Sequence, residues 1–213
     1  MGGVKNLPFL FDNETKSNYF CPMEKLIDEY GNRKYLTAQE RIKFEEAAKE
    51  AEREVRTFCL ILKNTGCRIS EALNLKVRNI DFEAKAVIFE TLKRRQRIFR
   101  QVPISDLFLD ELNLVHDLKS RQAQKKTAEE LIWNMSRATA SRKVDEVMKN
   151  AKIKGVQASP KGLRHGFAVA CVENKISLNI IQKWLGHSQM TTTAIYANVL
   201  GEEERNVAAR LWQ

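Results

Sequence analysis

The sequence predicts a mostly α-helical protein with one small antiparallel β-sheet. Apolar residues recur at helical spacing through most of the chain, and the segments 55–62 and 163–172 are apolar enough to lie in a core. Two segments with a strand-like pattern, 86–91 and 98–104, flank a short cationic run and therefore predict a single hairpin. Together these observations indicate the α+β class.

Capping residues predict where several helices begin and end. Thr37 and Glu40 form a capping box, in which each side chain accepts a backbone N–H near the helix start. Gly66 and Gly186 follow apolar helical segments, as expected of glycine in the left-handed conformation that ends a helix. Further predicted N-caps are Ser105 or Asp106, Ser136 and Ser177.

The region that follows the hairpin is less regular. Residues 120–130 are polar and predict a loop, and residues 131–133 predict one short strand. His116 is expected on a polar helix face and is given no functional role. Cys59 and Cys171 lie in apolar helical segments, which predicts that both are core residues.

The chain divides into a short irregular segment and a longer regular one. Residues 1–36 mix glycine and proline with isolated apolar residues, which predicts an N-terminal arm or extension and not a domain. Residues 37–213 then form the main domain, and a last helix is expected at about 202–212. One domain of this size can bury an ordinary hydrophobic core.

Composition favours a soluble protein with a polyanionic partner. The 213 residues are 43% hydrophobic and 30% charged, and no apolar run approaches the ~20 residues of a membrane span. We see no secretory signal, and four cysteines without C-x-x-C spacing fit free thiols in a reducing cytoplasm. The net charge of +9 favours nucleic acid as the partner, although a basic surface without any partner has the same charge.

Two short segments combine residues that suit phosphodiester chemistry. The sequence T-G-C-R-I-S-E contains Arg68, and K-G-L-R-H contains Lys161 and Arg164. His187 follows in L-G-H, and Tyr196 comes nine residues later. Guanidinium and ammonium groups neutralise non-bridging phosphate oxygens, and a phenol can attack phosphorus.

This set resembles the tyrosine recombinases, also called phage-type integrases. Their pattern is Arg, then His/Lys-x-x-Arg, then His/Trp and a nucleophilic Tyr, and the resemblance covers roughly residue 35 to the C-terminus. It implies the recombinase catalytic fold, whose hairpin also falls between the two Arg clusters. It further implies double-stranded DNA as the partner and a site-specific recombinase that forms a 3′-phosphotyrosyl link through Tyr196.

The resemblance also suggests roles for the other matched residues. Arg68 and Arg164 would hold the phosphate and stabilise the transition state. Lys161 stands where many members have His, and an ordinary lysine stays charged. His187 is therefore the imidazole expected either to donate to the phosphate or to assist the proton on Tyr196. His165 and Glu71 are expected to be supporting residues, His165 by hydrogen bonding and Glu71 by bracing the first Arg cluster.

The hairpin tip carries the least specific part of the match. Lys93 would be the general acid on the departing 5′-oxygen, although a basic run is more often a solvated face. The neighbouring Arg94, Arg95 and Arg97 are expected to contact DNA, and Arg100 continues the basic run. No carboxylate cluster has metal-ligand spacing, so we expect cleavage without a metal or a cofactor.

The family resemblance leaves assembly and several alternatives open. Members act as tetramers on two duplexes, often exchanging a C-terminal segment, and residues 202–212 could pack either in trans or on their own domain. The irregular N-terminal arm cannot be the clamp domain of many members, so the chain is either a catalytic fragment or a short single-domain member. The competing functions are a DNA-binding accessory protein that no longer cuts, a type IB topoisomerase and, as an outsider, a metal-dependent nuclease. A cytoplasmic, nucleoid-associated location follows from the DNA partner.

Overall fold

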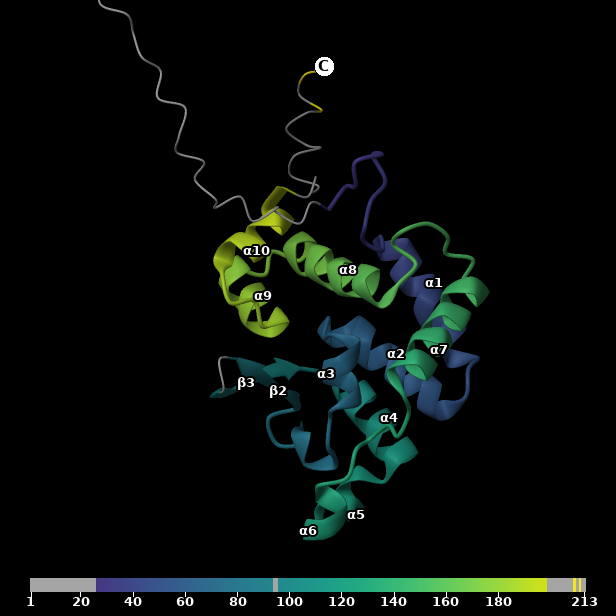
Figure 1. Ribbon diagram of the computed structural model, residues 1–213, viewed down its shortest axis with the longest axis vertical. Helices are drawn as coiled ribbons and strands as arrows, with labels where there is room; N and C mark the ends of the chain where they lie inside the picture. Colours follow the sequence, from purple (N-terminus) through teal and green to yellow (C-terminus); the bar gives the residue numbers. More distant parts are fainter. Residues whose placement is uncertain (1–25, 94–95, 199–208, 210, 212–213) are drawn as a thin grey trace, which may run out of the picture.

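The computed structural model describes residues 26–93 and 96–198, together with residues 209 and 211. Most of the predicted arm and nearly all of the predicted helix at 202–212 lie outside the described residues. In Figure 1, α8 (Pro160–Glu173) crosses the middle of the molecule, with α9 (Leu178–Leu185) at one end and α1 (Ala38–Lys49) at the other. The site described below lies where α8 meets α9.

The described part of the chain is mostly helical, as the sequence predicts. The α-helices not yet named are α2 (Arg53–Thr65), α3 (Ile69–Leu73), α4 (Asp106–His116), α5 (Leu118–Gln122), α6 (Lys125–Ala128), α7 (Arg137–Asn150) and α10 (Met190–Ala194). Two 3₁₀ turns, η1 (Val77–Asn79) and η2 (Ile195–Asn198), complete the helical elements.

The sheet has three antiparallel strands in the order β1-β2-β3. The predicted hairpin is formed by β2 (Ala86–Lys93) and β3 (Gln96–Pro103), and the two-residue β1 (Ile80–Asp81) was not predicted. Side chains alternate between the two faces of a strand, so Val87 and its cross-strand partner Val102 both point into the core. The hairpin thereby packs one face against the helices.

The predicted caps set most of the helix ends. Thr37 and Glu40 form the capping box of α1, and Ser105 and Ser136 accept a backbone N–H at the starts of α4 and α7. Gly66 and Gly186 end α2 and α9 in the left-handed conformation, with φ of 61° and 68°. Both of these helix C-termini expose a backbone carbonyl to the site.

Helix α2 is the centre of the main core. Phe58 and Ile61 on α2 are fully buried, and the helix contacts α1, α4 and α8. Burying one such side chain stabilises the fold by about 2 kcal/mol, which explains why an apolar helix occupies this position. A second cluster forms between α8 and α9, where Phe167, Leu185 and Tyr196 pack together.

Three expectations about the middle of the chain are wrong. Residues 120–130, expected to form a loop, contribute to α5 and α6, and the Gln122 side chain ties α5 to the carbonyls of Val77 and Ile80. Residues 131–133 form only an isolated bridge, between Leu131 and Lys76. His116 is buried instead of facing solvent on a polar face.

His116 can be buried because Thr57 hydrogen-bonds its ring and Trp133 packs edge-on against it. Its Nε2 lies 2.8 Å from Oγ1 of Thr57, and Nε1 of Trp133 donates to the same hydroxyl. The hydroxyl itself donates to the Glu54 carbonyl, so the imidazole Nε2 must carry the proton in this bond. The Nε2 atom of this buried ring is therefore hydrogen-bonded, as buried polar atoms usually are.

The described end of the predicted arm packs on the main domain. Leu36 is fully buried and its N–H donates to the Gly162 carbonyl of α8. Leu26 joins the cluster that contains Tyr196. In the described residues, the end of the predicted arm is therefore docked on the main domain, and the division at residue 36 stays a prediction. No helix in the described ranges is long and apolar enough to cross a membrane.

Candidate active site

Arg68 and Glu71 lie together at the start of α3. Arg68 is the N-cap residue, and its backbone N–H donates to Oε2 of Glu71 at 2.8 Å. Its Nη1 donates to Oε1 of the same carboxylate at 3.2 Å. The Arg68 side chain is 47% exposed, so the guanidinium is fixed at one end and still accessible at the other.

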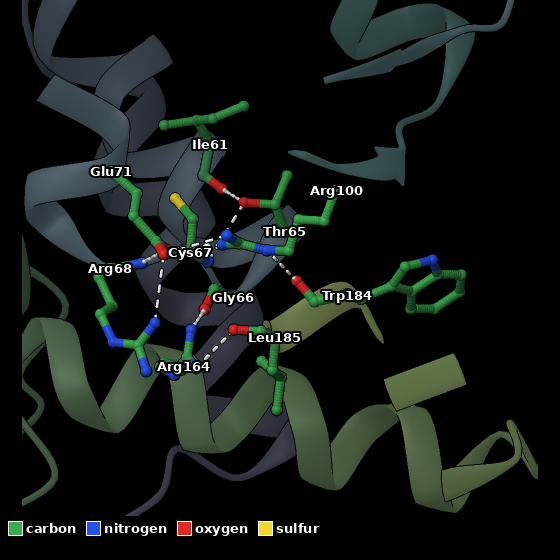
Figure 2. Close-up of polar contacts among 10 residues, drawn as sticks. All are labelled: Ile61, Thr65, Gly66, Cys67, Arg68, Glu71, Arg100, Arg164, Trp184 and Leu185. Atoms are coloured by element: carbon green, nitrogen blue, oxygen red, sulfur yellow. Dashed lines mark hydrogen bonds and ion pairs between the residues drawn. The ribbon is translucent and has the colours of Figure 1, made fainter. Parts of the chain in front are cut away.

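Glu71 is held on its other side by Arg100, as Figure 2 shows. Two guanidinium nitrogens of Arg100 bind its two carboxylate oxygens, at 3.0 and 2.6 Å, and Nε donates to the carbonyl of Trp184. Burial alone raises the pKa of Glu71, but the bonds from Arg100 and Arg68 outweigh it and the pKa lies below its usual range. The carboxylate is therefore charged at neutral pH.

Arg100 is thus a buried brace and does not continue the exposed basic run of the hairpin tip. Its side chain is 6% exposed and its guanidinium carbon lies 4.7 Å from the centroid of the Phe89 ring. Phe89 is its cross-strand partner, and Val102 shares its face of β3. The two-residue alternation from Val102 was the available signal that Arg100 points inward.

Arg164 is buried against the ends of two helices. Its Nη1 donates to the carbonyl of Gly66 at 2.8 Å, and its Nη2 to that of Leu185 at 2.7 Å. These carbonyls lie at the negative ends of α2 and α9, where the glycine turns expose them. Burial, and then the charge of Arg68, lower the pKa of Arg164 to about 10, so the guanidinium remains charged at neutral pH.

Tyr196 and His165 form a buried pair. The Oη atom of Tyr196 lies 2.8 Å from Nδ1 of His165, and their ring centroids are 5.9 Å apart. Tyr196 is 1% exposed and His165 3% exposed. The sequence assigned His165 a supporting role, and the structure places it directly on the phenol.

His187 is fixed by a hydroxyl from the next helix. Its Nδ1 lies 2.9 Å from Oγ1 of Thr193, which is fully buried. The His187 ring also lies nearly parallel to the ring of Tyr196, at 7° and a centroid distance of 6.5 Å. The turn that begins at Gly186 therefore presents the imidazole beside the phenol.

One cavity collects these side chains. It has a volume of about 500 Å³ and we call it the central cavity. Its chemically active lining residues are Arg68, Arg137, Lys161, Arg164, His165, His187 and Tyr196. A second cavity of about 780 Å³ shares Arg68 and His187 with it and extends toward Asn79 and Lys76. Several cations, two imidazoles and one phenol around one space can accommodate a phosphodiester.

The hairpin residues are placed only in part. The backbone of Lys93 pairs with that of Gln96 at the end of β2, and Arg94 and Arg95 lie outside the described residues. Arg97 is exposed and forms a 3.2 Å ion pair with Glu90. The expected roles of these cations therefore stay predictions.

The sequence profile described as "Phage integrase family" matches residues 34–203 of the chain. This match covers most of the 213 residues. The chain belongs to the phage integrase family. The family resemblance proposed from Arg68, Lys161, Arg164, His187 and Tyr196 is thereby confirmed.

Curated members of the phage integrase family are similar over part of their length. The tyrosine recombinase XerA of Thermococcus onnurineus is 28% identical over 183 residues, covering 81% of this chain and 60% of that protein. The tyrosine recombinase XerD of Staphylococcus aureus is 31% identical over 159 residues, covering 71% of this chain and 52% of that protein. The chain thus spans between half and two thirds of these relatives.

Solved structures of phage integrase relatives share the fold. The XerH site-specific recombinase bound to its difH substrate has a TM-score of 0.66 at 20% identity, covering 88% of this chain and 60% of that one. The catalytic domain of bacteriophage HP1 integrase has a TM-score of 0.57 at 22% identity, covering 83% and 93%. The predicted mostly helical fold with a small antiparallel sheet is therefore confirmed.

Two contacts of the site did not follow from the sequence. They are the bond of Thr193 to His187 and the bonds of Arg100 to Glu71 and to the Trp184 carbonyl. Thr193 stands three residues before Tyr196, and helical spacing from Tyr196 could have indicated a shared face. The inward position of Arg100 could have been read from strand alternation. Its bond to the Trp184 carbonyl could not, because 84 residues separate the two in sequence.

Proposed function

We propose that this chain is the catalytic domain of a site-specific DNA recombinase that cuts and rejoins strands through Tyr196. The observation that carries the proposal is the central cavity, in which the phenol of Tyr196 lies among Arg68, Lys161, Arg164 and His187. Membership of the phage integrase family supports it. XerH, which shares the fold, was solved bound to its difH substrate, and we take double-stranded DNA as the partner of this chain.

In this proposal two arginines hold the scissile phosphate. Arg164 uses two of its five N–H donors on the Gly66 and Leu185 carbonyls, which leaves its other donors for phosphate oxygens. Arg68 also lines the central cavity, and its half-exposed guanidinium supplies the second fork. Lys161 adds a third positive charge to the central cavity. These charges stabilise the pentavalent transition state where a metal ion would otherwise be needed.

Strand cleavage then transfers the phosphoryl group to the tyrosine. The Oη atom of Tyr196 forms a bond to phosphorus, and the bond from phosphorus to the 5′-oxygen breaks. The 5′-oxygen takes a proton from Lys93, the general acid in this proposal. The product is a 3′-phosphotyrosyl link and a free 5′-hydroxyl. The link keeps the phosphodiester energy, so rejoining to another strand needs no ATP.

The proposal extends to assembly and location. The protein acts as a tetramer on two duplexes, residues 202–212 pack on a neighbouring protomer, and Arg94, Arg95 and Arg97 contact DNA at the hairpin tip. It works in the cytoplasm on the nucleoid. The net charge of +9 supports association with DNA, because released counterions favour binding of cationic proteins.

The test is a covalent trapping assay on a suicide duplex. This is a nicked duplex that carries a candidate site taken from the repeats flanking the gene, and it loses a short strand on cleavage. In EDTA we expect a protein–DNA adduct that survives denaturation, is absent in Tyr196→Phe and persists in Tyr30→Phe. Tyr30 is the matched control because it is 81% exposed and remote in sequence from the cationic motifs.

Other outcomes of this assay would replace the proposal. Specific binding without an adduct would favour a DNA-binding accessory protein. An adduct on any duplex, with relaxation of supercoiled plasmid, would favour a type IB topoisomerase. Cleavage that EDTA abolishes would point to a metal-dependent nuclease.

A further inference from the structure

The buried pair of His165 and Tyr196 goes beyond the family pattern used above. A tyrosine can attack phosphorus only as its hydroxyl loses the proton, so some group must take that proton. The Nδ1 atom of His165 lies 2.8 Å from the Tyr196 hydroxyl, within the range of a hydrogen bond. Both residues line the central cavity, so the pair meets the space proposed for the phosphate.

The sequence left two roles open for His187, assisting the Tyr196 proton or donating to the phosphate, and the orientation of its ring bears on this choice. Its Nδ1 faces the Thr193 hydroxyl at 2.9 Å. Its ring lies nearly parallel to the ring of Tyr196, with 7° between the planes and 6.5 Å between the centroids. This geometry suits an imidazole that donates to the phosphate and leaves the phenolic proton to another group.

We propose that His165 is a catalytic residue that accepts the proton of Tyr196 during strand cleavage and returns it during rejoining. The inference rests on the proposed function. In cleavage, the Tyr196 oxygen bonds to phosphorus, its proton moves to Nδ1 of His165, and the 5′-oxygen leaves with a proton from the general acid. In rejoining, the His165 imidazolium gives its proton back as the tyrosine oxygen leaves phosphorus.

The ordinary pKa values of a phenol and an imidazole fit this order of proton transfers. A phenol has a pKa of about 10 and an imidazole of about 6.5, so the proton stays on the phenol until the bond to phosphorus forms. An imidazole can therefore accept the proton as that bond forms. Other charged or titratable groups around the pair also bear on the pH dependence. They are Arg68, Arg137, Lys161, Arg164 and His187 in the central cavity, and Tyr35 and Cys171 in the adjoining apolar cluster.

The structure requires one tautomer for this role. If Nδ1 of His165 accepts from the phenol, the neutral ring carries its proton on Nε2. In the opposite tautomer Nδ1–H would donate to Tyr196, and His165 could not take the proton. ¹⁵N NMR of the DNA-free protein separates these cases, and substitution of each of the three histidines assigns the signals. We expect an unprotonated Nδ1 whose shift changes in Tyr196→Phe, and a protonated Nδ1 would overturn the proposal.

The kinetic test compares His165→Gln with wild type on the suicide duplex over pH 6 to 10. Glutamine can still hydrogen-bond the phenol but cannot take its proton. We expect cleavage at least ~100-fold slower at neutral pH, with a deficit that shrinks roughly tenfold per pH unit as hydroxide forms the phenolate. His116→Gln is the matched control, because His116 lies outside the central cavity and should keep the wild-type pH profile.

Three other results would contradict the role. Faster cleavage by His165→Gln would show that the contact holds Tyr196 in a resting position. An equal deficit at every pH would show a positioning role, and an unchanged rate would show no role. His165→Asn, checked for its melting temperature, guards against a folding defect of one variant. Absence of an adduct in wild type would instead refute the proposed function, which keeps the two failures distinct.

Discussion

The guanidinium of Arg100 binds both carboxylate oxygens of Glu71, with N–O distances of 3.0 and 2.6 Å. Through Glu71 it braces Arg68, and through its Nε it holds the Trp184 carbonyl two residues before Gly186. One side chain on β3 thus connects the hairpin, the start of α3 and the turn that carries His187. A rigid connection between these elements keeps catalytic groups from separate parts of the chain in register.

Replacing Arg100 should therefore destabilise the domain. Arg100→Gln removes the two guanidinium bonds to the buried Glu71 carboxylate, and we expect the free energy of unfolding to fall by about 3 kcal/mol. Arg97→Gln is the matched control on the same strand, because its ion pair with Glu90 is exposed and should contribute less than about 0.5 kcal/mol. Urea unfolding of both variants measures the difference. Equal losses would contradict the bracing role.

Arg68 and Arg164 should respond differently to lysine. Arg164→Lys loses the bonds to the Gly66 and Leu185 carbonyls, so we expect a loss of about 2 kcal/mol in unfolding free energy together with slower cleavage. Arg68→Lys alters a half-exposed fork, so stability should change by less than about 0.5 kcal/mol while cleavage falls at least tenfold. Thermal melts and adduct yields report the two quantities. A stability loss in Arg68→Lys equal to that in Arg164→Lys would refute this division.

Thr193 should act through His187. Thr193→Val keeps the shape of the side chain and removes the hydroxyl bonded to Nδ1 of His187, so the imidazole loses the partner that fixes its tautomer. We expect cleavage to fall roughly 10- to 100-fold, with unchanged binding of the suicide duplex. Thr193→Ser should restore the rate, and exposed Thr191→Val should leave it unchanged. Failure of the serine variant to restore cleavage would indicate a packing effect instead.

Local signals predicted the elements that capping and alternation govern. Thr37, Ser105 and Ser136 cap helices as expected, because each acts on backbone N–H groups within its own turn. The hairpin followed from its flanking β-branched segments. The short helices α5 and α6 did not follow, because polar residues dominate them and α5 is held by the distant bonds of Gln122.

Side-chain partners distant in sequence explain the remaining differences. His116 lies seven residues after Leu109 and four after Leu112, so helical spacing places it on their buried face. Its partner Thr57 is 59 residues away, and a histidine in a sequence carries no sign of such a bond. The contact between His165 and Tyr196 was also missed, because 31 residues separate the two. The resemblance gave His165 no role at the phenol either.

His116 should make stability depend on pH. Burial, and then the charge of Arg121, lower its pKa to about 4, whereas an unfolded histidine titrates near 6.5. Below about pH 6.5 the unfolded state binds a proton that the folded state rejects until about pH 4, so stability falls across that window and not above it. Between pH 7 and pH 5 we expect a loss of about 2 kcal/mol from this group.

Urea unfolding at several pH values tests this expectation. His116→Gln should be less stable at neutral pH, because the bond to Thr57 changes, and should show a flatter pH dependence between pH 7 and pH 5. Trp133 lies with its ring centroid 5.4 Å from that of His116, so its fluorescence provides a local signal of the same titration. An identical pH slope in the variant would show that other groups control acid stability.

The most direct test of the account is to identify the atom that joins protein to DNA. The adduct formed on the suicide duplex in EDTA would be digested with trypsin and nuclease, and the peptide that retains a nucleotide sequenced by mass spectrometry. Trypsin releases residues 184–205, in which Tyr196 is the only tyrosine. We predict a 3′-linked nucleotide on Tyr196. A nucleotide on Tyr19, Tyr30, Tyr35 or a serine, or cleaved DNA with no linked peptide, would contradict the proposal that Tyr196 is the nucleophile.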